Sequence, residues 1–139
     1  MQRDTVLRWI DSLSALIARI LRRDPGASVE LARQQLDEAR RMLLGPMESL
    51  VPHLDPARAA DLLADPHRIY GYAQLLALES ALVHAAGVDG WRPIVERAVA
   101  LSRLAAARLD PPATEWLRWA DQAEADLKAE DPGSPRLPG

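Results

Sequence analysis

Three histidines are the obvious metal-binding side chains of this 139-residue chain: His53, His67 and His84. No two of them are three or four positions apart, and the pattern H-E-x-x-H is absent. Such spacing is what places two ligands on one helix face toward one zinc ion. If His67 and His84 share a helix, they are about 25 Å apart, at 1.5 Å per residue. We therefore predict no metal site and interpret the histidines as partly exposed residues near helix ends.

Nucleophilic and phosphate-binding motifs are also missing from the sequence. The chain has no cysteine, which excludes thiolate nucleophiles, disulfides and zinc–thiolate sites. It has no G-x-S-x-G elbow and neither of the two glycine-rich phosphate loops. The sequence therefore predicts no catalytic residue and no cofactor, and it gives no positive indication of an enzyme.

One carboxylate lies in an unusually apolar stretch. Glu79 is followed by Ser80, Ala81 and Leu82, in a segment that also contains Tyr70 and Tyr72. A buried carboxylate needs a positive partner, because an unpaired charge is costly to remove from water. We expect an arginine of a neighbouring helix, such as Arg97 or Arg103. The chemical hypothesis is a small-molecule pocket around Tyr70, Tyr72 and Glu79; the structural alternative is an ordinary ion pair or an exposed residue.

Two tryptophans are candidates for contact with a partner protein. Trp9 and Trp119 lie at the edges of the apolar stripes of their segments, so part of each ring is expected to face solvent. Exposed tryptophans are frequent anchors of protein interfaces. We predict Trp9 and Trp119 as partner-binding residues.

Helical signals run through the chain, whereas alternating strand patterns are absent. Asp-Pro pairs recur, and aspartate caps a helix start while proline suits the first helical position. Apolar residues recur at helical spacing in the segments between such signals. The predicted helices are 4–22, 28–44, 56–64, 66–86, 91–109 and 112–130, with a more broken stretch at 46–65 and a single turn near 47–51. The segment 66–86 is apolar nearly all round, which predicts a central helix.

The short predicted links favour antiparallel helix pairs. We predict an all-α fold in which these pairs stack as a tetratricopeptide-like array or form a compact helical bundle. Residues 1–130 form a single helical domain, and residues 131–139, rich in proline and glycine, form a disordered tail.

Composition limits the class of partner. Hydrophobic residues make up 48% of the chain and the net charge is −3. That charge does not favour a nucleic-acid surface. No apolar run approaches the roughly 20 residues that span a bilayer. The first helix is amphipathic and arginine-bearing, but an equally amphipathic helix follows it and is expected to cover its apolar face. We predict a cytoplasmic protein that binds neither membrane nor nucleic acid.

Small residues flank a leucine in two helices, as in Ala32, Leu36 and Ala39, and again in Ala100, Leu104 and Ala107. This spacing resembles the second helix of tetratricopeptide repeats, although the first-helix pattern W-x2-L-G-x2-Y and a strict 34-residue period are missing. The opening 2–10, the run 17–21 and the ending 43–45 resemble an uncharacterised bacterial family of short tetratricopeptide-like proteins. The resemblance covers most of residues 1–110 and implies a fold and a scaffold role, with no activity to transfer.

The leading functional hypothesis is a non-catalytic scaffold or adaptor that binds a protein partner. One alternative is a structural homodimer through the first helix, centred on Trp9, Leu16 and Ile20. The other is a small-molecule sensor or enzyme using the pocket near Tyr70, Tyr72 and Glu79.

Overall fold

Most of the helix starts and ends predicted from the sequence recur in the computed structural model. The model describes residues 3–129 and 135–138. For Arg3, Asp4 and Val6 it describes only the backbone. Two short 3₁₀ turns, η1 and η2, separate the second and third α-helices. No strand occurs in the described part of the chain. The elements are α1 (Arg3–Leu21), α2 (Val29–Leu44), η1 (Gly45–Met47), η2 (Val51–His53), α3 (Pro56–Leu63), α4 (Pro66–Ala85), α5 (Trp91–Ala107) and α6 (Thr114–Lys128).

Side-chain caps set several of these starts. Ser28 accepts a hydrogen bond from the Leu31 backbone N–H at 3.1 Å and begins α2. Asp55 caps α3 in the same way, and Asp65 caps α4. Each cap satisfies a backbone donor that the first helical turn leaves unpaired. The structure therefore confirms that the Asp-Pro pairs at 55–56 and 65–66 begin helices, and that Ser28 caps the helix predicted over 28–44.

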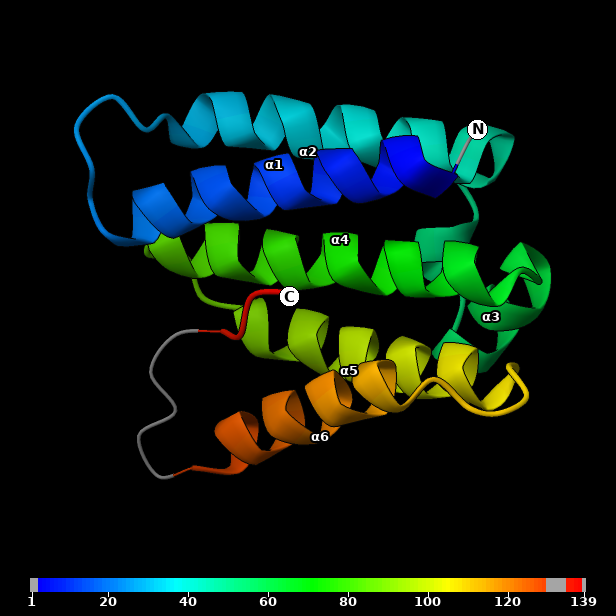
Figure 1. Cartoon of the computed structure of the whole chain (residues 1–139). Coiled ribbons are helices and arrows are strands. Elements are labelled where there is room, and N and C mark those ends of the chain that lie inside the picture. The colour runs from blue at the N-terminus through cyan, green and yellow to red at the C-terminus, as the bar shows by residue number, and fades with distance from the viewer. Residues whose placement is uncertain (1–2, 130–134, 139) are drawn as a thin grey trace.

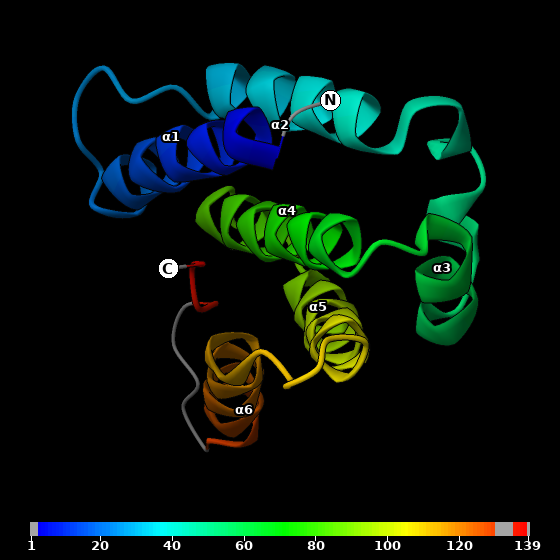
Figure 2. The ribbon, with the colours of Figure 1, turned by 45° about the vertical axis from the view of Figure 1, so that its right-hand side comes forward.

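The helices pack as antiparallel pairs around α4. α4 contacts α1, α2, α3 and α5, and α6 packs on the far side of α5. α1, α4 and α6 run in one direction, and α2 and α5 run in the opposite direction (Figure 1). Figure 2 shows α1, α4 and α6 surrounding the C-terminal segment on one side of the molecule. The all-helical prediction, with packed helix pairs and a central fourth helix, is confirmed.

The core is continuous through these layers. Its largest fully buried side chains include Ile17 of α1, Leu36 of α2, Tyr72 of α4 and Leu101 of α5. A smaller cluster, made of Val95, Val99, Ala120 and Ala123, joins α5 to α6. Removal of this apolar surface from water is the main force that holds the helices together.

The structure describes residues 135–138 of the predicted C-terminal tail. Where we predicted a disordered tail, Pro135 is buried and Leu137 packs against the main core. These two side chains bury apolar surface on the helices, which the proline-rich composition did not reveal. Residues 130–134 and 139 lie outside the described residues.

Candidate functional site

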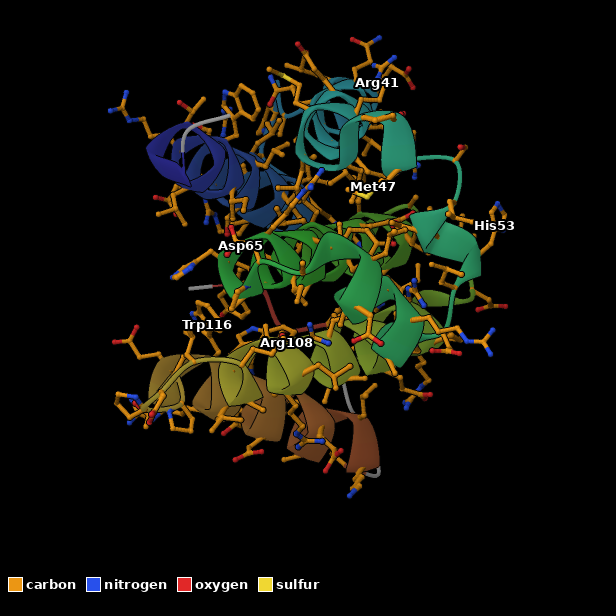
Figure 3. The ribbon with its side chains drawn as sticks, turned by 90° about the vertical axis from the view of Figure 1, so that its right-hand side faces the viewer. Arg41, Met47, His53, Asp65, Arg108 and Trp116 are labelled. Atoms are coloured by element: carbon orange, nitrogen blue, oxygen red, sulfur yellow. The ribbon has the colours of Figure 1, made fainter. Side chains whose placement is uncertain are left out.

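A cavity of about 680 Å³ opens where the first turns of α4 and α6 meet the start of α1 and the end of α2. We call it the aromatic cavity. Figure 3 looks onto this end of the molecule and labels Asp65, at the start of α4, and Trp116, in the first turn of α6. The lining residues are Leu7, Ile10, Met42, Leu43, Asp65, His67, Arg68, Tyr70, Gly71, Gln74 and Trp116.

Three rings form one wall of the aromatic cavity. Tyr70 of α4 and Trp116 of α6 stack with ring centroids 4.3 Å apart and planes 11° apart. His67 meets the edge of Trp116, with centroids 5.3 Å apart and an interplanar angle of 88°. His67 and Tyr70 are three residues apart and therefore lie on the same helix face. The rings join α4 directly to α6, although α5 lies between the backbones of these helices in the packing order.

Burial raises the pKa of the Tyr70 phenol to about 12, and the negative charge of Glu115 adds to this shift. Both causes favour the neutral form, because burial penalises the phenolate and Glu115 repels it. At neutral pH the Tyr70 hydroxyl is therefore a hydrogen-bonding group rather than a base or nucleophile.

Aliphatic side chains form the opposite wall, and two of them face solvent. Leu7 of α1 is 44% exposed and Met42 of α2 is 46% exposed, while Ile10 and Leu43 beside them are buried. The helical spacing of the segment 28–44 predicts a buried face that includes both Met42 and Leu43. Met42 instead borders the aromatic cavity at the last turn of α2. Gly71 is a buried residue of the cavity wall.

The charged groups of the cavity are engaged with the protein itself. The Arg68 guanidinium donates from Nε to the Leu43 carbonyl at 2.9 Å and from Nη2 to the Leu44 carbonyl at 3.1 Å. These bonds satisfy carbonyls at the end of α2. The Asp65 carboxylate accepts the His67 backbone N–H as the cap of α4. The lining therefore combines apolar surface of Leu7, Met42 and Trp116 with the polar side chains of Gln74, His67 and Tyr70.

Of the three residues predicted to form a pocket, only Tyr70 lines the aromatic cavity. Tyr72 is buried, with the Arg97 guanidinium over its ring at 5.9 Å, and Glu79 pairs with Arg40 of α2 at 3.5 Å. At about 100° per residue, both point roughly to the side of α4 opposite Tyr70. The three side chains therefore meet different neighbours.

The expected partner of Glu79 was on the wrong helix. We expected Arg97 or Arg103 of α5, but the carboxylate faces Arg40. Arg97 donates to the carbonyls of Leu54 and Val51, at 2.6 and 2.9 Å. Arg103 instead pairs with two carboxylates of α6. The helical register aims Glu79 toward α2 rather than α5, which spacing within α4 alone did not reveal.

The two predicted partner-binding tryptophans are both half-buried. Trp9 packs against the main core from α1. Trp119 also packs there, and its indole N–H donates to the Leu137 carbonyl at 3.2 Å. The first-helix stripe proposed for a homodimer is largely used within the chain, since Ile20 is 9% exposed and Leu16 packs against the core.

Sequence reasoning missed most of the aromatic cavity. The helical spacing of the segment 112–130 places Trp116 in its apolar stripe but does not show that the ring meets α4, and no pattern in the sequence singles out Leu7. The available signal was the grouping of His67, Tyr70 and Gly71 in the first turns of one helix. That grouping shows which face carries the rings, but not which helix meets it.

Within the described residues, no group of three or more histidine, aspartate or glutamate side chains is arranged to hold a metal ion. Among the helices that the structure describes, none is both long and apolar enough to cross a membrane.

No family model, no curated protein and no solved structure matches this chain. The assignment of a role to the site therefore depends on its geometry.

Proposed function

We propose that this chain is a non-catalytic helical adaptor that binds a partner protein by receiving an apolar side chain in the aromatic cavity. The observation that carries the proposal is an open cavity of about 680 Å³ between stacked rings and half-exposed aliphatic side chains. Burial of Leu7 and Met42 at its border should contribute most of the favourable binding free energy, because each leaves apolar surface in water. Aromatic and methionine side chains are also enriched in protein interfaces.

The hydrogen bonds and protonation of the polar groups in the cavity favour docking of a protein side chain over catalysis or recognition of a small molecule. Small-molecule sites combine an apolar lining with a few convergent polar groups that fix the ligand. Here Arg68 donates to the end of α2, Asp65 caps α4, and the Tyr70 phenol stays protonated at neutral pH. An apolar side chain needs no hydrogen bond from these groups, so it can bind without breaking the bonds that they make within the chain.

The order and direction of the helices support a tetratricopeptide-like arrangement as part of this proposal. α1, α4 and α6 run in one direction and surround one side, and α2 and α5 return behind them (Figures 1 and 2). Stacked helix pairs of this kind form a concave surface that can bind an extended or helical segment of a partner.

The test is selection of binding peptides from a random displayed library on the wild-type chain. The affinity of each selected peptide is then measured for Met42→Glu and for the matched control Leu31→Glu. Both residues lie on α2 and are similarly exposed, at 46% and 45%. They are separated by about 16 Å along the helix.

We expect selected peptides to lose at least tenfold in affinity for Met42→Glu, because the carboxylate must be buried without a partner, and to bind Leu31→Glu normally. Equal affinity for Met42→Glu and the wild type, or failure to select any binder, contradicts the proposal.

A further inference from the structure

The C-terminal segment lies along α6 next to the aromatic cavity. Pro135 and Arg136 form part of a crevice whose other walls are Trp91 and Val95 of α5 and Ala123, Asp126 and Leu127 of α6. Arg136 Nε is 2.8 Å from the Asp126 carboxylate oxygen Oδ2. The segment is therefore held by apolar burial together with a charged hydrogen bond.

The next residue of the segment is held one to two turns farther back along α6. The Leu137 side chain packs against the main core, and its carbonyl accepts the Trp119 indole N–H at 3.2 Å. The segment therefore runs antiparallel to α6, from Asp126 toward Trp119. Trp116, a wall of the aromatic cavity, lies one turn beyond Trp119 in the same direction.

The α6 residues that line the crevice and the aromatic cavity, Asp126, Ala123 and Trp116, follow one another along one side of that helix. We call this surface the α6 groove and define it by Asp126, Ala123, Trp119 and Trp116. Figure 2 shows the backbone of the C-terminal segment between α6 and α1, on one side of α4.

We propose that the α6 groove recognises a non-helical segment of a partner protein in which proline is followed by a basic residue and leucine, and that residues 135–138 occupy the groove in cis until such a segment displaces them. This inference rests on the proposed function, and it adds the chemistry of the partner. Each feature has its own contact: Pro135 is buried and forms one wall of the crevice, Arg136 pairs with Asp126, and Leu137 packs against the main core.

The charge and stiffness of the segment fit this role. Proline restricts the free peptide, so less conformational entropy is lost on binding. The Arg136 guanidinium holds the pKa of the Asp126 carboxyl below its usual range, which is the direction expected of a carboxylate that stabilises a docked cation.

The tether explains how weak contacts can keep the groove filled. A segment joined by a short linker meets its site at an effective concentration on the order of a millimolar. A partner segment must bind strongly enough to displace the tethered segment. It can do so by also placing an apolar side chain in the aromatic cavity, because residues 135–138 do not line that cavity.

The experiment uses the full chain with Leu137→Asp, which removes the apolar contact of the segment. The probe is a labelled synthetic peptide with the sequence of residues 131–139, DPGSPRLPG, measured by fluorescence anisotropy. Leu50→Asp, at a residue that is 49% exposed and outside the α6 groove, is the matched charge control. Circular dichroism verifies that all variants keep their helices.

We expect the peptide to bind Leu137→Asp about tenfold more tightly than the wild type or Leu50→Asp, because the tethered competitor is gone. Binding should restore the wild-type position of the Trp119 indole N–H resonance, and Asp126→Asn in the Leu137→Asp chain should weaken it. Equal affinity for the wild type and Leu137→Asp, no binding at millimolar peptide, or binding without a change at Trp119 overturns the inference.

A further variant separates this inference from the proposed function. Met42→Glu combined with Leu137→Asp should leave the affinity for this peptide unchanged, because the peptide does not reach the aromatic cavity. If the library selection fails but this peptide binds, the result contradicts only the proposal of docking in the aromatic cavity. If the selection succeeds but this peptide does not bind, the result contradicts only the inference that residues 135–138 occupy the α6 groove in place of a partner segment.

Discussion

Tyr70 of α4 stacks face to face on Trp116 of α6, with ring centroids 4.3 Å apart. This contact links the central helix to the last one across the mouth of the aromatic cavity. It therefore contributes both to the shape of the cavity and to the docking of α6.

Replacement of Trp116 by alanine should lower the free energy of unfolding by about 2–3 kcal/mol, since it removes a half-buried ring and its stacking. Trp116→Phe keeps a ring and should lose less than half as much. Urea unfolding of the two variants measures the difference. Equal stability of Trp116→Ala and the wild type is incompatible with the stack as a link between α4 and α6.

The Tyr70 phenol should ionise near pH 12, and the unfolded chain should ionise near the ordinary value of about 10. Between these values the unfolded state has lost the proton and the folded state keeps it, so stability should fall as the pH rises through this window. Below pH 10 the contribution is fully present. Absorbance at 295 nm after a rapid pH jump, in Tyr72→Phe, isolates the titration of Tyr70.

Glu115→Gln should move that titration of Tyr70 to lower pH, because the repelling charge is removed. The shift should be only partial, since burial is the larger cause. A titration of Tyr70 at its ordinary pH, with or without Glu115, would show that the ring is not buried as described.

Arg97 joins α5 to the turn η2 through two carbonyls. Arg97→Ala should lower the free energy of unfolding by about 2–3 kcal/mol, because charge-assisted hydrogen bonds are lost and carbonyls are left unpaired. Arg97→Lys should recover only part of this, since an ammonium group does not reproduce the two-pronged guanidinium. The exposed Arg118→Ala is the control and should change stability by less than about 0.5 kcal/mol.

Local chemistry predicted most of the helix boundaries, but not all. Asp65-Pro66 begins α4 as expected, whereas Asp110-Pro111 precedes α6, which begins at Thr114 with Ala113 at the cap position. Asp-Pro is equally compatible with a turn, so the pair alone does not fix a helix start. The packing of the following apolar stripe decides where the helix begins.

The candidate site was less predictable, because it depends on contacts between distant parts of the chain. Tyr70 was singled out from its apolar surroundings, but its contact with Trp116 spans 46 positions. Helical spacing places Met42 in the apolar stripe of α2, and only the packed structure shows that it is 46% exposed at the border of the cavity. Periodicity identifies the apolar face of a helix, whereas a cavity is the part of that face which no partner helix reaches.

The most direct test of docking in the aromatic cavity follows the methyl groups of Met42 and Met47 by NMR in a chain labelled with ¹³C-methyl methionine. Met42 borders the cavity, and Met47 packs against the core elsewhere. During titration with a library-selected peptide, the Met42 methyl resonance should shift in proportion to binding, while that of Met47 stays in place. Saturable binding that leaves the Met42 resonance unmoved contradicts the account.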